Sequence, residues 1–154
     1  MAAYDTITNA DTYFGTRLHV LVWAESTNAD KTKALAEASA RIDRLRFKGA
    51  MVASDQDRSF PRYYGDDPDG TETVPDDIKI ACYECAYALL DGVDPELELE
   101  NLAVSSQGIS SVRNTYARGE VPEHFAAGIP SAFAWRYLKP YIACGNIVRI
   151  RRVS

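Results

Sequence analysis

The sequence predicts a mainly α-helical fold: a small helical bundle with a β-hairpin and an extended basic C-terminal arm. Two segments, 30–45 and 75–91, repeat apolar residues at helical spacing and carry helix start and stop signals. A third segment, 147–154, is short, β-prone and basic. With 154 residues, 46% of them hydrophobic and 25% charged, the chain is expected to form one domain with a real core. We place the helical domain at 1–146, with an inserted loop at 50–74 and a hairpin at 101–117, and the arm at 147–154.

The first helix is expected over about 9–18. Thr8 is a candidate N-cap, and Asp11 stands three residues later in the position of the acidic member of a capping box. The apolar run 19–23 fits a strand, a helix end or a buried loop, because periodicity does not discriminate among them at this length.

The helix from Asp30 to Leu45 is the strongest prediction. Apolar residues recur there at spacings of three and four and therefore share one face: Leu35, Ala38, Ile42 and Leu45. Several alanines raise the helix propensity and allow a neighbouring helix to approach closely. Gly49 is expected to end the helix, after basic residues that suit its negative C-terminal end.

A second helix is expected from Pro75 to Asp91, because Pro75 and the two aspartates after it suit a first helical turn. It carries two apolar stripes, one formed by Ile78, Cys82, Cys85 and Leu89 and the other by Tyr83, Tyr87 and Leu90. A helix that is apolar on two sides is central in the core or shared with a partner. We expect it to pack against the first long helix, and we take Tyr83 and Tyr87 as candidate partner contacts.

The segments between and after these helices are less regular. The loop 50–74 is rich in Pro, Gly and Asp, and loops of this length are usually functional. Segment 91–100 has five acidic residues and no basic one. Segment 103–112 is rich in serine and β-branched residues around a glycine, which predicts the hairpin. An aromatic helix is expected over 130–142, kinked or ended near Pro140.

No residue pattern predicts a catalytic or metal site. Cys82 and Cys85 have C-x-x-C spacing but fall in mid-helix on an apolar stripe, where structural thiols are expected rather than a redox pair or zinc ligands. The chain has two histidines and neither a phosphate-binding glycine loop nor a nucleophile elbow. We therefore expect a protein that is not an enzyme and has no cofactor or metal. Three cysteines, an odd number, favour a reducing compartment, and neither a signal peptide nor a membrane span is expected.

Charge and the C-terminal arm bear on the choice of partner. The formal net charge of −5 argues against a generic high-affinity DNA binder. In an extended arm, the side chains of Arg149 and Arg151 would lie on one edge and those of Val148 and Ile150 on the other. Such an arm suits strand addition to a partner as well as it suits phosphates. The candidate partner contacts of the arm are Arg149, Ile150, Arg151 and Arg152.

Short motifs in a fixed order cover about residues 8–141. They are Asn9-Ala10-Asp11-x-Tyr13, Trp23, Lys33-Ala34-Leu35-x-x-Ala38-x-x-x-Ile42-Asp43, Phe47-x-Gly49, Asp55-Gln56, Phe60-Pro61-Arg62, Val74-Pro75-x-x-Ile78-x-x-Ala81-x-x-Glu84-x-Ala86 and Leu138-Lys139-Pro140-Tyr141. In this order and spacing, the sequence resembles the tailed-phage head–tail connector adaptors, also called head-completion proteins. Some relatives of that family are labelled DnaT-like single-stranded-DNA-binding proteins. The insert 63–73 matches the family pattern least well.

The resemblance implies a structural role in the virion neck, at the head–tail interface, for a protein made in the host cytoplasm. Adaptors of that family form a ring, commonly of twelve copies, beneath the portal protein, and they present a surface to the stopper or tail proteins. DNA passes through the lumen without sequence-specific binding, and no membrane is involved. A ring needs two different complementary patches on each copy, and the acidic stretch 91–100 and the basic arm are candidates. The alternative is a single-stranded-DNA-binding protein, which would need a cationic groove interleaved with aromatic rings.

Overall fold

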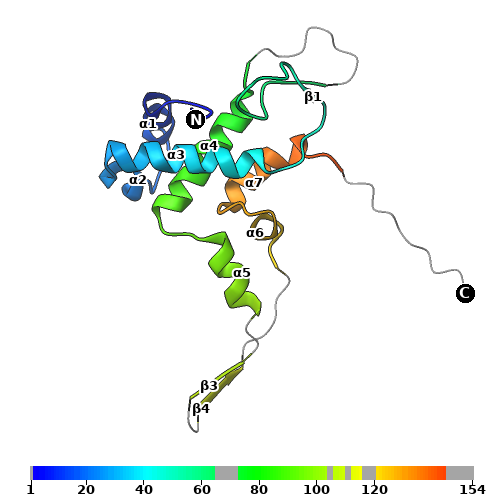
Figure 1. Ribbon diagram of the computed structural model, residues 1–154. Helices are drawn as coiled ribbons and strands as arrows, with labels where there is room; N and C mark the ends of the chain where they lie inside the picture. The colour runs from blue at the N-terminus through cyan, green and yellow to red at the C-terminus, as the bar shows by residue number, and fades with distance from the viewer. Residues whose placement is uncertain (1, 65–72, 104–105, 110–111, 116–120, 145–154) are drawn as a thin grey trace, which may run out of the picture.

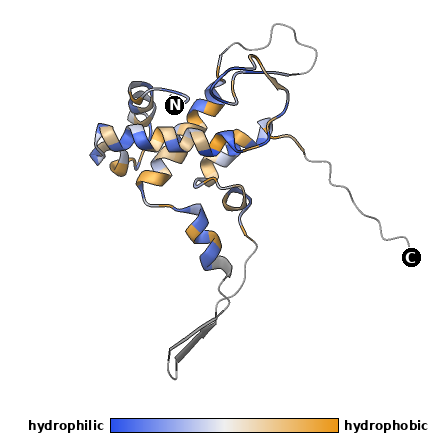
Figure 2. Cartoon of the chain, in the orientation of Figure 1, coloured by the Kyte–Doolittle hydropathy of each residue, from blue (hydrophilic) through white to orange (hydrophobic). Residues whose placement is uncertain are grey.

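The computed structural model describes residues 2–64, 73–103, 106–109, 112–115 and 121–144. Its centre is a pair of crossing helices, α3 (Asn28–Asp43) and α4 (Asp76–Leu90) (Figure 1). Small side chains line the crossing, and the Ser39 hydroxyl lies 3.2 Å from the Cys82 sulfur with both residues fully buried. The prediction that these two helices pack together to form the core is confirmed. Figure 2 shows apolar residues concentrated at this crossing.

The boundaries of α3 differ from the predicted ones. Thr27 caps its start by accepting a hydrogen bond from the backbone NH of Asp30 at 3.2 Å. The helix ends at Asp43, so the prediction that Gly49 ends it is wrong. Gly49 has φ +74°, and a Cβ there would lie 1.9 Å from the Tyr63 carbonyl oxygen. Its glycine is therefore required by a close approach of two loop strands, not by a helix end.

Two short helices precede α3: α1 (Ile7–Gly15) and α2 (Leu21–Glu25). The cap of α1 is Thr6, which accepts from the NH of Asn9 at 3.3 Å, so the predicted capping box at Thr8 and Asp11 is wrong. Asp11 instead accepts hydrogen bonds from the Trp23 indole at 2.8 Å and the Lys31 ammonium at 3.0 Å. This carboxylate ties α1, α2 and α3 together. The ambiguous apolar run at 19–23 thus comprises the end of the turn before α2 and the first three residues of α2.

The inserted loop carries a small antiparallel pair, β1 (Ala50–Met51) and β2 (Arg62–Tyr63), with Ala50 opposite Tyr63. The loop is fastened to the end of α3 through Asp43. That carboxylate accepts from the Arg58 guanidinium at 2.7 Å and from the Ser59 NH at 3.0 Å. The loop predicted at 50–74 is therefore ordered over its described part.

Beyond α4 the chain forms α5 (Pro95–Ala103) and the antiparallel hairpin β3 (Ser106–Ile109) and β4 (Val112–Thr115), followed by α6 (Glu123–Ala126), α7 (Ala132–Leu138) and a 3-10 turn, η1 (Lys139–Tyr141). The predicted hairpin is confirmed. Most of the acidic stretch 91–100 lies in α5, a helix that the sequence did not predict.

The aromatic helix expected over 130–142 is α7, and it gives way to the 3-10 turn η1 at Pro140, as predicted. The predicted arm at 147–154 lies outside the described residues, and no helix in the described part of the chain is long and apolar enough to cross a membrane.

Candidate assembly surfaces

The helix α5 and the hairpin β3–β4 form a projection from the helical body (Figure 1). Among the described elements, α5 packs against the short helix α6, whereas the extended contacts of β3 and β4 are with each other. A lone two-stranded hairpin is at best marginally stable in water, because it has no third strand or helix to cover a face. The projection therefore offers two paired strands that a partner can cover.

Arg41 on α3 fastens α5 to the body. Its guanidinium donates to the Glu96 carboxylate at 2.9 and 3.1 Å, to Glu37 at 3.2 Å and to the carbonyl of Gly128 at 3.0 Å. The hydrogen bonds from Arg41 lower the pKa of Glu96 to about 2. The acidic side chains of α5 and of the turn before it are all exposed: Asp91, Asp94, Glu96, Glu98 and Glu100. Arg41 thus adds an ion pair to the packing of α5 against α6, and the acidic side chains of this stretch face solvent.

A buried carboxylate links α1, α4 and α7. Glu84 is 3% exposed and accepts two hydrogen bonds from the Arg17 guanidinium at 2.8 and 2.7 Å, and one from the Tyr13 hydroxyl at 2.7 Å. The hydrogen bonds that Arg17 donates to Glu84 raise the pKa of Arg17. Arg17 also lies over the Phe133 ring, 4.7 Å from its centroid. Sequence reasoning gave Glu84 no role, although a lone acid on an apolar helix is a signal that a cation lies nearby.

An exposed apolar pair follows Arg17 in the turn between α1 and α2. Leu18 is 79% exposed and Leu21 is 67% exposed. His19 between them has φ 60°, in the left-handed region that few residues other than glycine adopt. Two neighbouring leucines this open to water are an interface candidate, although scattered single ones are ordinary.

The two tyrosines predicted as partner contacts lie on α4 at different depths. Tyr83 is 5% exposed, and its hydroxyl donates to Asp5. Its ring packs against Tyr13, with 5.3 Å between the centroids. Tyr87 is half-buried and donates to the His19 carbonyl at 2.8 Å, next to the exposed leucines. Contact with a partner stays a prediction for both tyrosines. Of the two, Tyr87 is the more accessible to a partner.

A basic edge forms where two distant segments pair. The NH of Lys48 donates to the Tyr141 carbonyl at 2.8 Å, and the NH of Ala143 donates to the Arg46 carbonyl at 2.9 Å, with Phe47 opposite Ile142. Two exposed cations lie on this edge, Arg46 and Lys48, and the exposed Arg44 precedes them at the end of α3. The fold thus brings the basic end of α3 to the point where the chain continues toward the predicted arm. The arm residues Arg149, Ile150, Arg151 and Arg152 lie outside the described residues.

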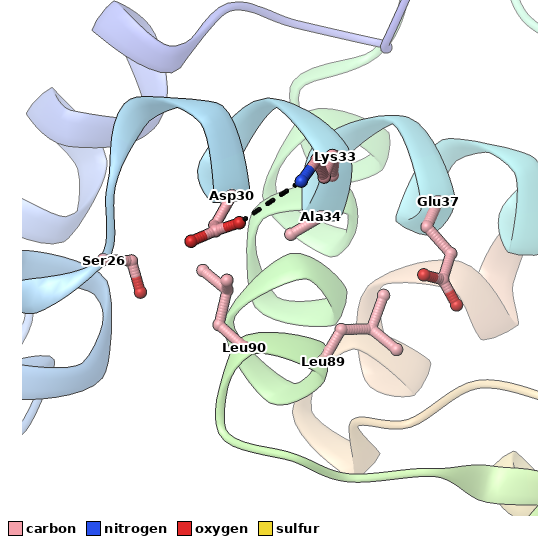
Figure 3. Close-up of a pocket in the computed structure, with 7 residues that line it drawn as sticks. All are labelled: Ser26, Asp30, Lys33, Ala34, Glu37, Leu89 and Leu90. Atoms are coloured by element: carbon pink, nitrogen blue, oxygen red, sulfur yellow. Dashed lines mark ion pairs between the residues drawn. The ribbon is translucent and has the colours of Figure 1, made fainter.

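A groove of about 380 Å³ opens between the N-terminal half of α3 and the end of α4 (Figure 3). Leu89 and Leu90 point from α4 toward α3 and form its floor. Its rim carries both signs of charge, with Lys33 3.6 Å from Asp30. Its lining is Ser26, Asp30, Lys33, Ala34, Glu37, Leu89 and Leu90. A groove with an apolar floor and a polar rim fits an amphipathic segment better than a small polar ligand.

The two cysteines of the C-x-x-C pair are fully buried on α4, as predicted for structural thiols. Burial raises the pKa of Cys82 to about 11 and also raises the pKa of Cys85, so neither is a thiolate at neutral pH. Within the described ranges, no three His, Cys, Asp or Glu side chains are grouped so as to hold a metal ion.

A family model described as "Putative DnaT-like ssDNA binding protein" matches residues 1–153, nearly the whole chain. No curated protein and no solved structure shows significant similarity to the chain.

Proposed function

We propose that this chain, which belongs to the DnaT-like ssDNA-binding protein family, is a head–tail adaptor of a tailed phage. It assembles as a ring, with about twelve copies as the resemblance implies, between the portal protein and the stopper or tail proteins. The observation that supports this most is the projection formed by α5 and the hairpin. A hairpin packed mainly on itself gains stability when a neighbouring chain covers it, and a ring provides that neighbour in every copy.

The distribution of surfaces suits a ring. A closed ring needs a heterologous contact, in which two different patches of each copy meet. The projection and the basic edge extend from separate parts of the body, and Leu18 with Leu21 supply a third patch on the α1–α2 turn (Figure 1). A monomer would leave all three uncovered.

The charges suit DNA passage rather than tight DNA binding. Many of the described cations are already paired with carboxylates, among them Arg17, Lys31, Arg41, Arg58 and Lys139. Paired cations release few counterions from a phosphate backbone, so they add little to nucleic-acid affinity. A net charge of −5 also favours a lumen to which DNA does not adhere.

Single-stranded-DNA binding is the second candidate, and the description of the family favours it. The basic edge is where it would take place. However, the rings beside that edge pack edge-to-face on one another: Phe47 and Phe60 have centroids 4.6 Å apart, and Phe60 and Tyr141 have centroids 5.8 Å apart. Rings committed to a core do not stack with bases, which that function requires.

Two measurements on the purified full-length protein decide between the candidates. Negative-stain imaging of the protein is expected to show rings, and imaging after mixing with DNA-filled heads that carry the portal but lack tails is expected to show these rings at the neck. The added protein is also expected to restore infectivity to those heads. A gel-shift titration with oligo(dT) at several salt concentrations is expected to show weak binding. Tight, steeply salt-dependent binding that is lost in Arg46→Gln/Lys48→Gln, without any attachment to heads, would establish the second candidate instead.

A variant without the hairpin tests whether the projection formed by α5 and the hairpin is needed for attachment. Replacing 104–117 by a short Gly-Ser linker removes no side chain of the α3–α4 core, so the melting temperature is expected to change little. Attachment to heads is expected to be lost. Normal attachment by the hairpin-less protein would refute the role given to the projection.

A further inference from the structure

We infer that the groove between α3 and α4 receives the C-terminal segment 145–154 of a neighbouring copy. This inference rests on the proposed ring, and it names one of the contacts that closes it. The groove and the segment are complementary in three respects: apolar character, charge and length.

The apolar match lies between the groove floor and the alternating residues of the segment. Leu89 and Leu90 are half-buried at the end of α4, and the buried Ala34 leaves room above them (Figure 3). In an extended chain, Val148 and Ile150 point to one side. Covering the two leucines with these side chains removes apolar surface of both from water.

The charge match lies between the groove rim and the arginines. Asp30 and Glu37 stand on the same face of α3, with side chains 53% and 55% exposed. Each already faces one cation, Lys33 at 3.6 Å and Arg41 at 3.2 Å. An ionised carboxylate has about four acceptor positions, so each can accept further hydrogen bonds from Arg149 or Arg151.

The lengths agree as well. The two helical turns from Asp30 to Glu37 span about 10 Å. Residues 148–151 of an extended chain span about 10 Å as well, three intervals of roughly 3.3 Å. The four residues with the strictest alternation therefore cover the length of the rim.

The geometry of the body favours a neighbour's segment over the chain's own. Ala143 is bonded to Arg46, beyond the C-terminal end of α3, whereas the groove lies along the N-terminal half of that helix. The last described residues run away from α3 at that point (Figure 1). A segment leaving one end of the body and a groove at the other end make a head-to-tail contact, the kind that closes a ring.

A peptide titration tests the contact directly. The host is full-length protein carrying Val148→Asp/Ile150→Asp, which disables its own segment. A fluorescent peptide of residues 145–154 is expected to bind it saturably at one per chain, and a peptide of scrambled sequence and the same composition is expected to bind at least about fivefold more weakly, since order sets the alternation. Adding Asp30→Asn/Glu37→Gln to the host is expected to weaken peptide binding roughly tenfold.

The matched control Asp55→Asn/Asp57→Asn removes the same charge from an exposed loop and is expected to leave peptide binding unchanged. Absence of saturable binding, or equal loss in the control, overturns the inference.

A mixing experiment then tests whether the contact is between copies. Full-length Asp30→Asn/Glu37→Gln has a segment but a weakened groove, and full-length Val148→Asp/Ile150→Asp has a groove but a disabled segment. Sedimentation of an equimolar mixture is expected to show a one-to-one heterodimer at concentrations about tenfold below those at which the groove variant associates with itself. Peptide binding without a heterodimer would mean that a segment attached to its own body cannot reach a neighbour's groove, which overturns the proposed neighbour. If the segment is dispensable while rings still attach to portal-bearing heads, this inference fails and the adaptor function stands.

Discussion

The Arg17–Glu84 pair offers the sharpest test of how the body supports its surfaces. Glu84→Gln keeps the size of the side chain and an acceptor for the Tyr13 hydroxyl but removes the negative charge. Removing one partner of a fully buried ion pair costs about 3–5 kcal/mol, because the other charge is left buried and unpaired. Arg17 is about one third exposed and regains part of its hydration. We therefore expect the free energy of unfolding to fall by about 2–3 kcal/mol.

Chemical denaturation and thermal melting measure this loss. For a chain of 154 residues, a loss of that size lowers the melting temperature by roughly 4–12 °C. A double variant, Arg17→Met/Glu84→Leu, replaces both charges with apolar groups and is expected to recover most of the loss, since neither charge is then left unpaired. Glu123→Gln is the control: its carboxylate pairs with Lys139 at 2.9 Å, but both side chains are exposed, and melting should not change.

The outcome also bears on assembly. The pair holds the turn that carries the exposed leucines, so Glu84→Gln is expected to weaken ring formation more than an equally destabilising core variant does. A loss below about 0.5 kcal/mol would show that the pair is effectively solvated. That result would refute the reasoning from burial, and with it the expected effect on the rings.

The remaining predictions concern the core, the thiols and the projection. Ile42→Ala removes a fully buried side chain and is expected to cost about 2–5 kcal/mol, whereas Leu89→Ala, at a half-buried position, is expected to cost less than about 1.5 kcal/mol; denaturation curves that reverse this order contradict the assigned faces. Replacing Cys82 and Cys85 together by alanine is expected to lower stability modestly and leave assembly intact, and one zinc per chain that vanishes in the double variant would contradict the structural role of the thiols. The carboxyl of Glu96 has its pKa lowered from 4.5 to about 2, so its ion pair stabilises the folded chain above about pH 4.5 and is lost as the pH falls toward 2. The difference in stability between wild type and Glu96→Gln is therefore expected to shrink over that range, and a difference that grows on acidification would contradict the sign.

The long helices were predictable because their apolar spacing is repeated over four turns. Leu35, Ala38 and Ile42 fall on one face of α3, and all three are buried against α4. The caps were less predictable, because threonine is common near α1 and only the backbone path decides which one accepts a hydrogen bond. Thr6 and Thr8 differ in sequence position by two residues, but one lies before the helix and the other inside it.

The candidate surfaces were harder to predict, because they depend on pairing between distant segments. The basic end of α3 and the start of the C-terminal segment are separated by about a hundred residues, and the Phe47–Ile142 bridge brings them together. The same holds for Glu84, whose partner Arg17 lies 67 positions earlier in the chain. Neither contact leaves a local pattern, and the second was only hinted at by an acid among apolar residues.

The acidic stretch 91–100 has no helical apolar spacing, so its sequence predicts a charged segment and not a helix. Its glutamates alternate with leucines over 96–100, which is a strand-like spacing, and Pro95 opens it. Asp94 decides the matter locally, because its carboxylate accepts from the NH groups of Glu96 and Leu97 at 3.1 and 3.3 Å and so caps the first turn. Arg41 then holds Glu96 against the body. The start of α5 is therefore held by this cap, by the ion pair with Arg41 and by packing against α6. Weakening the ion pair while keeping the cap is expected to alter how neighbouring copies meet before it alters whether each copy folds.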